Sequence, residues 1–265
     1  MEIKFYKYQG TGNDFVLVDN RESNIPTLDV KTVKNICDRN FGIGADGFIQ
    51  LNTKEGYDFE MVYYNADGSE STMCGNGGRC MVQFAHDLGM LKSEYKFWAI
   101  DGEHIANMTT AYNSNDKIVR LKMQDVHAVD KHTDYAVLNT GSPHYVKIQT
   151  DVRHLNVAEE GAAIRYSKAF EDSGVNVNFV ESTGPYSIFV RTYERGVEAE
   201  TLSCGTGVTA AALLCAHNDR GFNEVQVQTN GGKLSVEFDK IDDDNFEEIY
   251  LCGPAKFVFS GVIKI

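Results

Sequence analysis

The chain has 265 residues, 42% of them hydrophobic, with 13 Tyr and 15 Phe and a formal net charge of −13. This composition suffices for two domains of ordinary size, and the negative charge argues against a nucleic-acid partner because phosphate backbones bind positive surfaces. No apolar run approaches the roughly 20 residues that span a membrane, and residues 1–5 lack a signal-peptide pattern. We therefore expect a cytoplasmic protein that binds neither nucleic acid nor membrane.

The first half of the chain predicts strands around two helices. A helix is expected over residues 28–40, where Val30, Val33 and Ile36 share one side, and a glycine-rich loop follows at 41–47. A second helix is expected after Cys74, since apolar residues recur there at helical spacing. Alternating and β-branched runs predict strands at 3–8, 15–19, 48–51, 59–64, 96–100, 104–110 and 118–123.

The second half repeats this order. A short helix is expected near 152–158, a longer one after Cys204, and a hairpin turn at Gly231-Gly232. Strands are predicted at 135–138, 145–148, 175–180, 188–193, 225–228, 234–238 and 257–265. The polar stretch Asn113–Asp116 is the expected boundary, which gives an N-terminal half at 1–116, a C-terminal half at 117–256, and a terminal strand at 257–265 that returns to the N-terminal half. The predicted fold class is α+β.

An internal duplication accounts for the repeated order. Cys204 follows Cys74 by 130 positions, and each cysteine begins a Cys-Gly-polar-Gly segment with a glutamate four residues before it. Other segments match in the same order at nearly this spacing, namely 12–16 with 141–146 and 46–49 with 177–180. We therefore expect two pseudo-symmetric halves, each with a β-rich sheet around a long helix.

Both cysteines stand where a glycine-rich turn begins a helix. Backbone N–H groups and the helix dipole at that position favour a thiolate and bind carboxylates. A facing pair of thiols suits redox, metal or acid–base chemistry, but no Cys-x-x-Cys motif is present and the histidines do not cluster. Acid–base work is the interpretation that fits best, with one group removing a proton from a carbon and the other delivering one to its opposite face. The other four cysteines are predicted to be buried small hydrophobes.

Several motifs resemble those of the diaminopimelate epimerase family. They are Gly-Thr-Gly-Asn-Asp-Phe at 10–15, Asn-Ala-Asp-Gly-Ser at 65–69, Met-Cys-Gly-Asn-Gly at 73–77, Asn-Val-Asn-Phe at 176–179, Tyr-Glu-Arg-Gly at 193–196 and Cys-Gly-Thr-Gly at 204–207. The resemblance covers essentially the whole chain. It implies a homodimeric isomerase that interconverts LL- and meso-2,6-diaminopimelate in lysine and peptidoglycan-precursor biosynthesis. It also implies no cofactor and no metal, and an active site in the cleft between two pseudo-symmetric halves.

The resemblance also assigns site residues by position. It implies that Cys74 and Cys204 are the acid–base thiols, and that His144 and Glu194 take part in catalysis. The substrate-binding residues that it implies are Asn13, Asn65, Gly75, Asn76, Asn176, Glu194, Arg195, Gly205 and Thr206. A forked guanidinium at Arg195 suits a carboxylate and Glu194 an ammonium, which fits a substrate with two amino-acid ends.

Three positions depart from the family pattern. The family's usual Asn-Pro-His is Ser142-Pro143-His144 here, and Gly47 stands where glutamine is common. Phe259 replaces a C-terminal tyrosine associated with the dimer contact. The first two bear on recognition of the distal end of the substrate, and the third bears on the dimer.

Two other functions remain open from the sequence. A proline or hydroxyproline racemase-type enzyme also has paired cysteines, but its substrate gives no use for the Glu194-Arg195 pair. A non-catalytic amino-acid-binding protein does not need both cysteines, so serine at either position should leave it intact.

Overall fold

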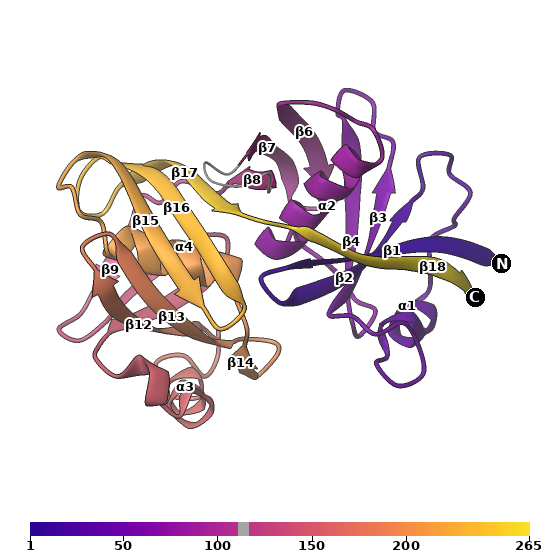
Figure 1. Cartoon of the computed structure of the whole chain (residues 1–265). Coiled ribbons are helices and arrows are strands. Elements are labelled where there is room, and N and C mark those ends of the chain that lie inside the picture. The colour runs from indigo at the N-terminus through magenta and orange to yellow at the C-terminus, as the bar shows by residue number, and fades with distance from the viewer. Residues whose placement is uncertain (111–116) are drawn as a thin grey trace. The chain divides into compact units, whose positions relative to one another are not determined.

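The computed structural model describes residues 1–110 and 117–265, which form two compact units (Figure 1). Met1–Leu121 and Gly253–Ile265 form the N-terminal unit, and Lys122–Cys252 form the C-terminal unit. The boundary expected at Asn113–Asp116 lies outside the described residues. In the described part of the chain, no helix is long and apolar enough to cross a membrane.

The N-terminal unit contains a mixed sheet that the last strand of the chain completes. Its strands are β1 (Glu2–Gly10), β2 (Asn13–Asp19), β3 (Gly47–Asn52), β4 (Phe59–Asn65), β5 (Glu70–Ser71), β6 (Glu94–Ala99), β7 (Gly102–Thr110), β8 (Lys117–Lys122) and β18 (Lys256–Lys264). The main row runs β18–β1–β2–β3–β4–β6–β7–β8. Within it, β2–β3 and β4–β6 are parallel and the other pairs antiparallel.

The C-terminal unit repeats that row strand for strand. Its strands are β9 (Val129–Lys131), β10 (Ala136–Asn139), β11 (Pro143–Ile148), β12 (Asn176–Gly184), β13 (Ser187–Glu194), β14 (Ala199–Thr201), β15 (Gly221–Thr229), β16 (Gly232–Lys240) and β17 (Phe246–Gly253). The row runs β9–β10–β11–β12–β13–β15–β16–β17, with β11–β12 and β13–β15 parallel. The parallel pairs fall at the same places in both rows, which confirms the predicted duplication.

Each sheet packs against a buried helix that begins immediately after a predicted catalytic cysteine. Helix α2 (Gly75–Asp87) packs on β1, β2 and β3, and residues 75–85 are all buried. Helix α4 (Gly205–Leu214) packs on β11, β12, β13, β15 and β16, and most of its residues are buried. Helix α4 is apolar on nearly all sides and must therefore be enclosed by other elements, whereas α2 is buried together with its polar residues Asn76, Arg79 and Gln83. Both helix N-termini thus have fixed positions within their units.

The remaining helices differ from the predicted ones at their ends. Helix α1 (Val30–Cys37) is shorter than the predicted 28–40. The Asp29 carboxylate caps its start, and Asp38 ends it by accepting the N–H groups of Asn40 and Phe41. The predicted helix near 152–158 is wrong in extent, because it divides into a 3₁₀ turn, η1 (Val152–His154), and helix α3 (Val157–Arg165), which Asn156 caps.

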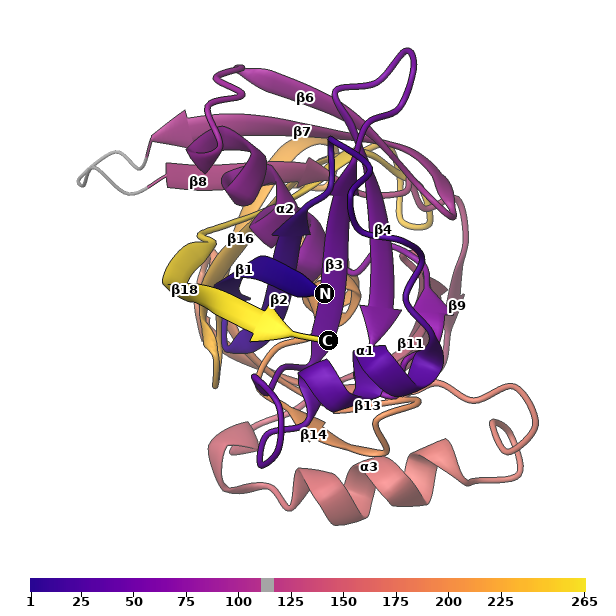
Figure 2. The same cartoon turned by 90° about the vertical axis from the view of Figure 1, so that its right-hand side faces the viewer.

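Helix α3 covers one face of strand β12, and the other face of that strand lies towards α4. It packs on β12, β13 and β14, and Figure 2 shows α3 next to β13 and β14. Val177 and Phe179 of β12 lie in the same core cluster as Val157 of α3. Alternate residues of a strand point to opposite faces, and Asn178 accordingly lies against Gly207 of α4.

Strand β17 and the turn between β15 and β16 differ from the sequence prediction. Strand β17 was not predicted, because adjacent exposed residues Glu247 and Glu248 break the alternation and Glu248 has a positive φ of 49°. The hairpin pairs Thr229 with Gly232, so its two-residue loop is Asn230-Gly231 rather than Gly231-Gly232.

Candidate active site

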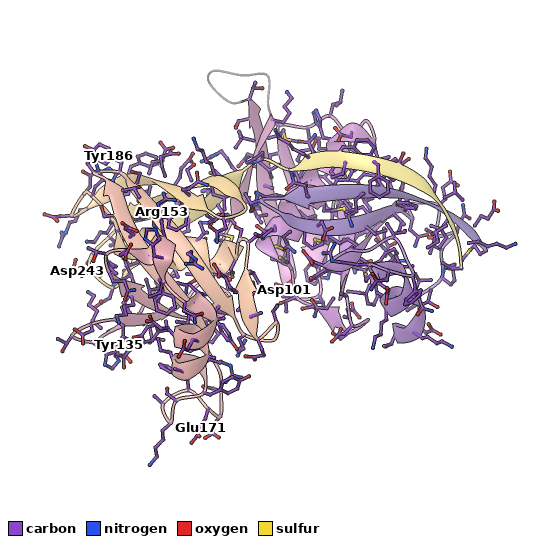
Figure 3. All side chains as sticks on the ribbon, turned by 60° about the horizontal axis from the view of Figure 1, so that its bottom comes forward. Asp101, Tyr135, Arg153, Glu171, Tyr186 and Asp243 are labelled. Carbon is purple, nitrogen blue, oxygen red and sulfur yellow. The ribbon has the colours of Figure 1, made fainter. Side chains whose placement is uncertain are left out.

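Cys74 is the N-cap residue of α2, and its thiol is half-buried. Its extended backbone (φ −90°, ψ 130°) turns the chain into the helix, and its carbonyl accepts the N–H of Gly78 at 2.7 Å. The first N–H groups of a helix have no partner within the helix, so those of Gly75 and Asn76 are suited to bind an anion. Met73, the residue before Cys74, donates its backbone N–H to the Asp101 carboxylate at 3.2 Å (Asp101 is labelled in Figure 3). This bond fixes the backbone that leads into α2.

The Asn13 side chain contacts Cys74 within the N-terminal unit. The Cys74 thiol donates to Asn13 Oδ1 at 3.7 Å, and Asn76 Nδ2 donates to the same oxygen at 3.2 Å. Asn13 Nδ2 donates to the Asp46 carboxylate at 2.6 Å. A carboxylate accepts and cannot donate when ionised, so Asp46 fixes the orientation of the Asn13 amide. The amide oxygen therefore faces the thiol.

A buried arginine holds the first turn of α2. Arg79 has no exposed surface and donates to the Gly75 carbonyl, to Asn76 Oδ1 and to Thr11 Oγ1 at 3.2, 2.9 and 3.3 Å. These bonds tie the β1–β2 turn to the residues after Cys74. Arg79 was not predicted as a functional residue, and the sequence signal that could have found it is an arginine inside the helical pattern after Cys74.

Ion pairs at Asp14 and Asp46 stabilise the backbone around Asn13. Asp14 pairs with Lys7 at 2.9 Å and with Arg39 at 2.8 Å, and Arg39 also pairs with Asp46 at 2.7 Å. Burial favours the neutral form of Asp14, but hydrogen bonds from Arg39 and Lys7 outweigh burial and lower its pKa to about 2. The two carboxylates are thus held next to cations, and Asp46 remains an acceptor for Asn13.

Cys204 occupies the corresponding position at the start of α4. It is the N-cap residue (φ −108°, ψ 115°) and is 7% exposed. Its Sγ lies 3.5 Å from Thr206 Oγ1, which lies 3.3 Å from Ser142 Oγ. Thr140 Oγ1 donates to the Thr206 carbonyl at 2.8 Å and ties this turn to the end of β10.

His144 connects to Cys204 through Ser142. His144 Nε2 lies 3.0 Å from Ser142 Oγ, and His144 Nδ1 lies 3.1 Å from Asn178 Nδ2. The imidazole is completely buried, and burial together with the charge of Arg195 lowers its pKa to about 3. His144 is therefore neutral at physiological pH, and no direct contact joins it to the Cys204 sulfur among the described hydrogen bonds.

Asn176 links Ser142 to the predicted Glu194-Arg195 pair. Its Nδ2 donates to Ser142 Oγ at 3.1 Å, and its Oδ1 accepts the backbone N–H of Arg195 at 2.8 Å. The Arg195 guanidinium donates to the Ser173 carbonyl at 2.9 Å, and Glu194 accepts from Thr201 Oγ1 at 2.9 Å. The structure therefore joins Asn176 to the first turn of α4 through Ser142 and to the backbone of Arg195, whereas the side chains of Arg195 and Glu194 contact Ser173 and Thr201.

Asn65 and Gly47 belong to the N-terminal unit, at the end of β4 and the start of β3. Asn65 accepts from the Tyr63 hydroxyl at 2.9 Å and donates to Ser69 Oγ at 3.3 Å, so it joins neither Asn13 nor Cys74 directly in the described bonds. A Cβ at position 47 would lie 2.5 Å from Tyr63 Cε2 and 2.8 Å from the Tyr64 carbonyl. The Tyr63 ring occupies the space that a side chain at position 47 needs, which explains the glycine.

Comparison with known proteins identifies relatives over nearly the whole chain. The sequence model of the diaminopimelate epimerase family matches residues 5–127 and again residues 136–258. The diaminopimelate epimerase of Flavobacterium psychrophilum is 49% identical over 262 residues, covering 98% of this chain and 100% of the relative. That of Chlorobaculum tepidum is 41% identical, covering 97% and 99%.

The chain belongs to the diaminopimelate epimerase family. Solved structures of low sequence identity share the fold alone. A phenazine biosynthesis protein of the PhzF family from Bacillus anthracis has a TM-score of 0.77 at 14% identity and covers 100% of both chains. A hydroxyproline epimerase from Agrobacterium vitis, with bound trans-4-hydroxy-L-proline, has a TM-score of 0.70 at 14% identity, covering 99% of this chain and 92% of that one.

Besides Arg79, sequence reasoning missed three residues of this family member that orient the predicted ones. Asp46 fixes Asn13, Asn178 contacts His144, and Ser142 bridges His144 and Thr206. Asn178 could have been found, since it stands two residues after Asn176 on a predicted strand and so faces the same side. Ser142 was noted only as a departure from the family pattern.

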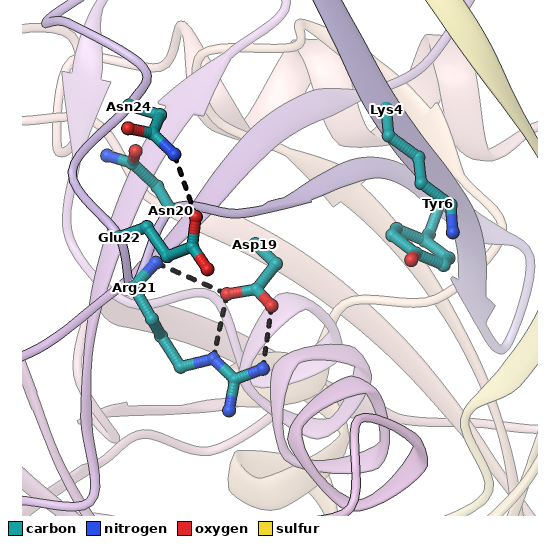
Figure 4. Close-up of a pocket in the computed structure, with 7 residues that line it drawn as sticks. All are labelled: Lys4, Tyr6, Asp19, Asn20, Arg21, Glu22 and Asn24. Carbon is teal, nitrogen blue, oxygen red and sulfur yellow. Dashed lines mark hydrogen bonds and ion pairs between the residues drawn. The ribbon is translucent and has the colours of Figure 1, made fainter.

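An open surface pocket of about 430 Å³ on the N-terminal unit is separate from the cysteines (Figure 4). None of the predicted site residues lines it; the lining residues are Lys4, Tyr6, Asp19, Asn20, Arg21, Glu22 and Asn24. The Arg21 guanidinium donates two hydrogen bonds to the Asp19 carboxylate, at 2.8 and 2.7 Å, so the positive charge of Arg21 is already paired. Among the described residues, no group of three or more His, Cys, Asp and Glu is placed to hold a metal ion.

Proposed function

We propose that this chain is an isomerase that interconverts LL- and meso-2,6-diaminopimelate without a cofactor, in lysine and peptidoglycan-precursor biosynthesis. The observation that carries the proposal is the placement of the two cysteines. Each is the N-cap of a buried helix, and they stand at nearly the same distance from the starts of the two segments that match the family. The identity of 49% with a named diaminopimelate epimerase over nearly the whole chain supports the choice of substrate.

In the proposed mechanism, Cys74 and Cys204 exchange protons with one α-carbon. One thiolate removes the α-hydrogen as a proton, and the electron pair stays on the substrate and spreads into its carboxylate. The other thiol then protonates the opposite face of the carbon. The N–H groups of Gly75 and Asn76, and of Gly205 and Thr206, are proposed to stabilise the charge that builds on that carboxylate, since helix N-termini favour anions.

We assign the distal amino-acid end to polar residues of both units. Arg195 presents a forked donor for a carboxylate and Glu194 an acceptor for an ammonium. Asn13, Asn65 and Asn176 are proposed to complete the binding of the substrate, and His144 to support catalysis from its buried position. Asn176 already holds the backbone of Arg195 at 2.8 Å, which supports its assignment to this group.

Isotope incorporation tests the paired-thiol mechanism. The enzyme is incubated with LL-diaminopimelate in deuterated water, and the reaction is stopped after little conversion. Two monoprotic bases predict solvent deuterium at the inverted carbon of the product and almost none in recovered substrate. Substantial retention of the original hydrogen in the product would refute the mechanism.

Matched cysteine variants complete that test. Cys74→Ala and Cys204→Ala should each abolish inversion, because each removes the proton carrier of one face. Cys215→Ala is the control, since Cys215 is the C-cap residue of α4 and burial raises the pKa of its thiol to about 11. Inversion of L-proline or trans-4-hydroxy-L-proline in place of diaminopimelate would favour a proline racemase-type activity instead. Unimpaired binding by the serine variants without any turnover would favour a binding protein.

We also propose that the enzyme is a cytoplasmic homodimer in which a second copy covers β18. This strand pairs with β1 through one edge, while Phe257, Val258, Phe259 and Val262 are 45–64% exposed. Exposed apolar edge strands promote pairing with another chain. Val262→Lys should convert a dimer to a monomer in light scattering, whereas Leu91→Lys, at a residue 73% exposed outside β18, should not. A reducing cytoplasm suits an enzyme that depends on two thiols.

A further inference from the structure

Arg195 stands on an exposed turn between two strands of the C-terminal unit. Strand β13 ends at Glu194, which pairs with Ala199 of β14, so residues 195–198 form the loop between these strands. Arg195 itself is exposed. A side chain on an exposed loop has a fixed position only if other groups hold the backbone of that loop. Recognition by Arg195 therefore depends on the residues that hold the turn in place.

Glu198 closes this turn with both its backbone and its side chain. Its N–H donates to the Glu194 carbonyl at 2.8 Å, and its Oε1 accepts the N–H of Gly196 at 3.1 Å. Its φ of 55° lies in the left-handed region, which disfavours a residue with a Cβ. Glycine would adopt that backbone without strain, so the bonds of the carboxylate are the physical reason for a glutamate at this position.

The Glu198 carboxylate also joins the turn to the end of α3, which packs on the two flanking strands (Figure 2). It lies 3.5 Å from Nε of Arg165, the last residue of the helix, and accepts from the Tyr193 hydroxyl at 3.4 Å. The Arg165 side chain is largely buried, so solvent screens this pair less than a surface ion pair. Burial favours the neutral carboxyl, but the hydrogen bonds that Glu198 accepts and the charge of Arg165 outweigh burial and lower its pKa. The carboxylate is thus ionised at neutral pH.

The side chain of Arg195 lies against the same part of the unit as Arg165. Its guanidinium donates to the Ser173 carbonyl at 2.9 Å. A Cβ at Gly174 would lie 2.6 Å from Arg195 Cδ and 2.8 Å from Arg165 Cζ, so both arginine side chains pack against this glycine. Arg165 also donates to the Phe170 carbonyl at 3.3 Å, and that carbonyl accepts the N–H of Gly174. The position of Arg165 therefore bears directly on that of Arg195.

We propose that Glu198 and Arg165 are positioning residues for the distal end of the substrate. Their ion pair ties the exposed turn to α3 and so sets the direction of the Arg195 guanidinium, and this role rests on the proposed function. Arg195 makes the contact with the distal carboxylate, and the other two residues act through it. Because ordering a flexible loop on binding costs conformational entropy, a turn that is already ordered binds its ligand more tightly.

Glu198→Gly is the variant that separates positioning from stability. Glycine accepts the left-handed backbone, so the substitution removes the carboxylate and relieves strain at the same time. The melting temperature should stay close to that of the wild type. KM for diaminopimelate should rise about tenfold, and kcat should change by less than about twofold, because the distal contact is the same in the ground state and in the transition state.

Glu248→Gly is the matched control. Glu248 is also a glutamate with a left-handed backbone, at φ 49° on β17, and it too contacts a cation and a tyrosine, Lys122 and Tyr250. Its replacement should leave KM unchanged. Glu198→Gln keeps an acceptor for the turn but loses the charge, so its KM should rise less than that of Glu198→Gly. Arg165→Met removes the partner on α3 and should also raise KM.

Hydrogen–deuterium exchange tests the positioning in the substrate-free enzyme, without any turnover. The N–H groups of Gly196 and Glu198 are bonded within the turn, and bonded amides exchange only when the local structure opens. Mass spectrometry of a peptide that covers residues 193–199 should show faster exchange in Glu198→Gly than in the wild type or in Glu248→Gly.

Two results would overturn the inference. The first is a folded Glu198→Gly enzyme whose KM is unchanged or rises no more than that of Glu248→Gly. The second is exchange over residues 193–199 that is as slow in Glu198→Gly as in the wild type. If the wild-type enzyme does not turn over diaminopimelate, the proposed function fails instead, and the exchange experiment still decides whether Glu198 orders the turn.

Discussion

Replacing Gly207 by alanine is expected to damage the C-terminal unit, although alanine is the better helix former. Gly207 is in the first turn of α4, where a Cβ would lie 2.3 Å from Asn178 Oδ1 and 3.3 Å from Thr192 Oγ1. Asn178 has no exposed surface, and its amide is held by Tyr145, His144 and Thr192. It cannot move away from the added methyl group without breaking these bonds.

The size of the effect follows from three contributions. Overpacking a close-packed core costs roughly 1–3 kcal/mol. Each buried group that loses its partner when Asn178 moves costs about 1–3 kcal/mol more. Replacing glycine by alanine within a helix stabilises the helix by only about 1 kcal/mol. We expect a net loss of roughly 2–4 kcal/mol, which lowers the urea midpoint by about 1–2 M at an m value near 2 kcal/mol/M.

The matched control is Gly77→Ala, at the corresponding position of α2. There a Cβ would meet the ends of flexible side chains, Ile49 Cδ1 at 3.3 Å and Met61 Cε at 3.5 Å. Its stability should stay within about 1 kcal/mol of wild type. Urea unfolding is followed by far-ultraviolet circular dichroism and by fluorescence of Trp98, the chain's single tryptophan, which lies in the N-terminal unit. Equal midpoints for the two alanine variants would refute the reasoning.

Three further predictions concern the same two helix starts. His144 has a pKa of about 3 in the folded protein against 6.5 ordinarily, so the unfolded chain binds the extra proton. The stability that is present above pH 6.5 is therefore lost as the pH falls, by up to about 1.4 kcal/mol per pH unit. His144→Gln should reduce the dependence of the urea midpoint on pH between about pH 6.5 and 4. An equally steep decline of the urea midpoint in that variant would contradict this prediction. Arg79→Met removes the guanidinium that donates to the Gly75 carbonyl, Asn76 Oδ1 and Thr11 Oγ1, and should destabilise the N-terminal unit by roughly 2–4 kcal/mol, seen as a lower Trp98 fluorescence midpoint. Arg195→Ala should raise KM for diaminopimelate by at least about 30-fold through loss of the charged partner of the distal carboxylate, and unchanged KM would exclude that role.

The sequence by itself determined the duplication, the fold class and the family. These features rest on order and spacing along the chain: two Cys-Gly-polar-Gly segments 130 residues apart, each followed by a helical pattern. Local physical chemistry sufficed to place each cysteine at a helix start, because glycine-rich turns and good helix formers act within a few residues. The strands with clear alternation were predicted for the same reason, and β17 was missed where two exposed glutamates interrupt it.

Only the tertiary structure decided which side chains orient the cysteines. Asp46 reaches Asn13 across 33 positions, Ser142 reaches Thr206 across 64, and Asn178 reaches His144 across 34. Parallel pairing of β11 with β12 sets His144 opposite Asn176, and that register has no signature in the local sequence. The two cysteine motifs are alike in sequence, but an acceptor lies beside one thiol and a hydroxyl beside the other, because hydrogen-bond direction depends on partners that folding brings together from distant strands.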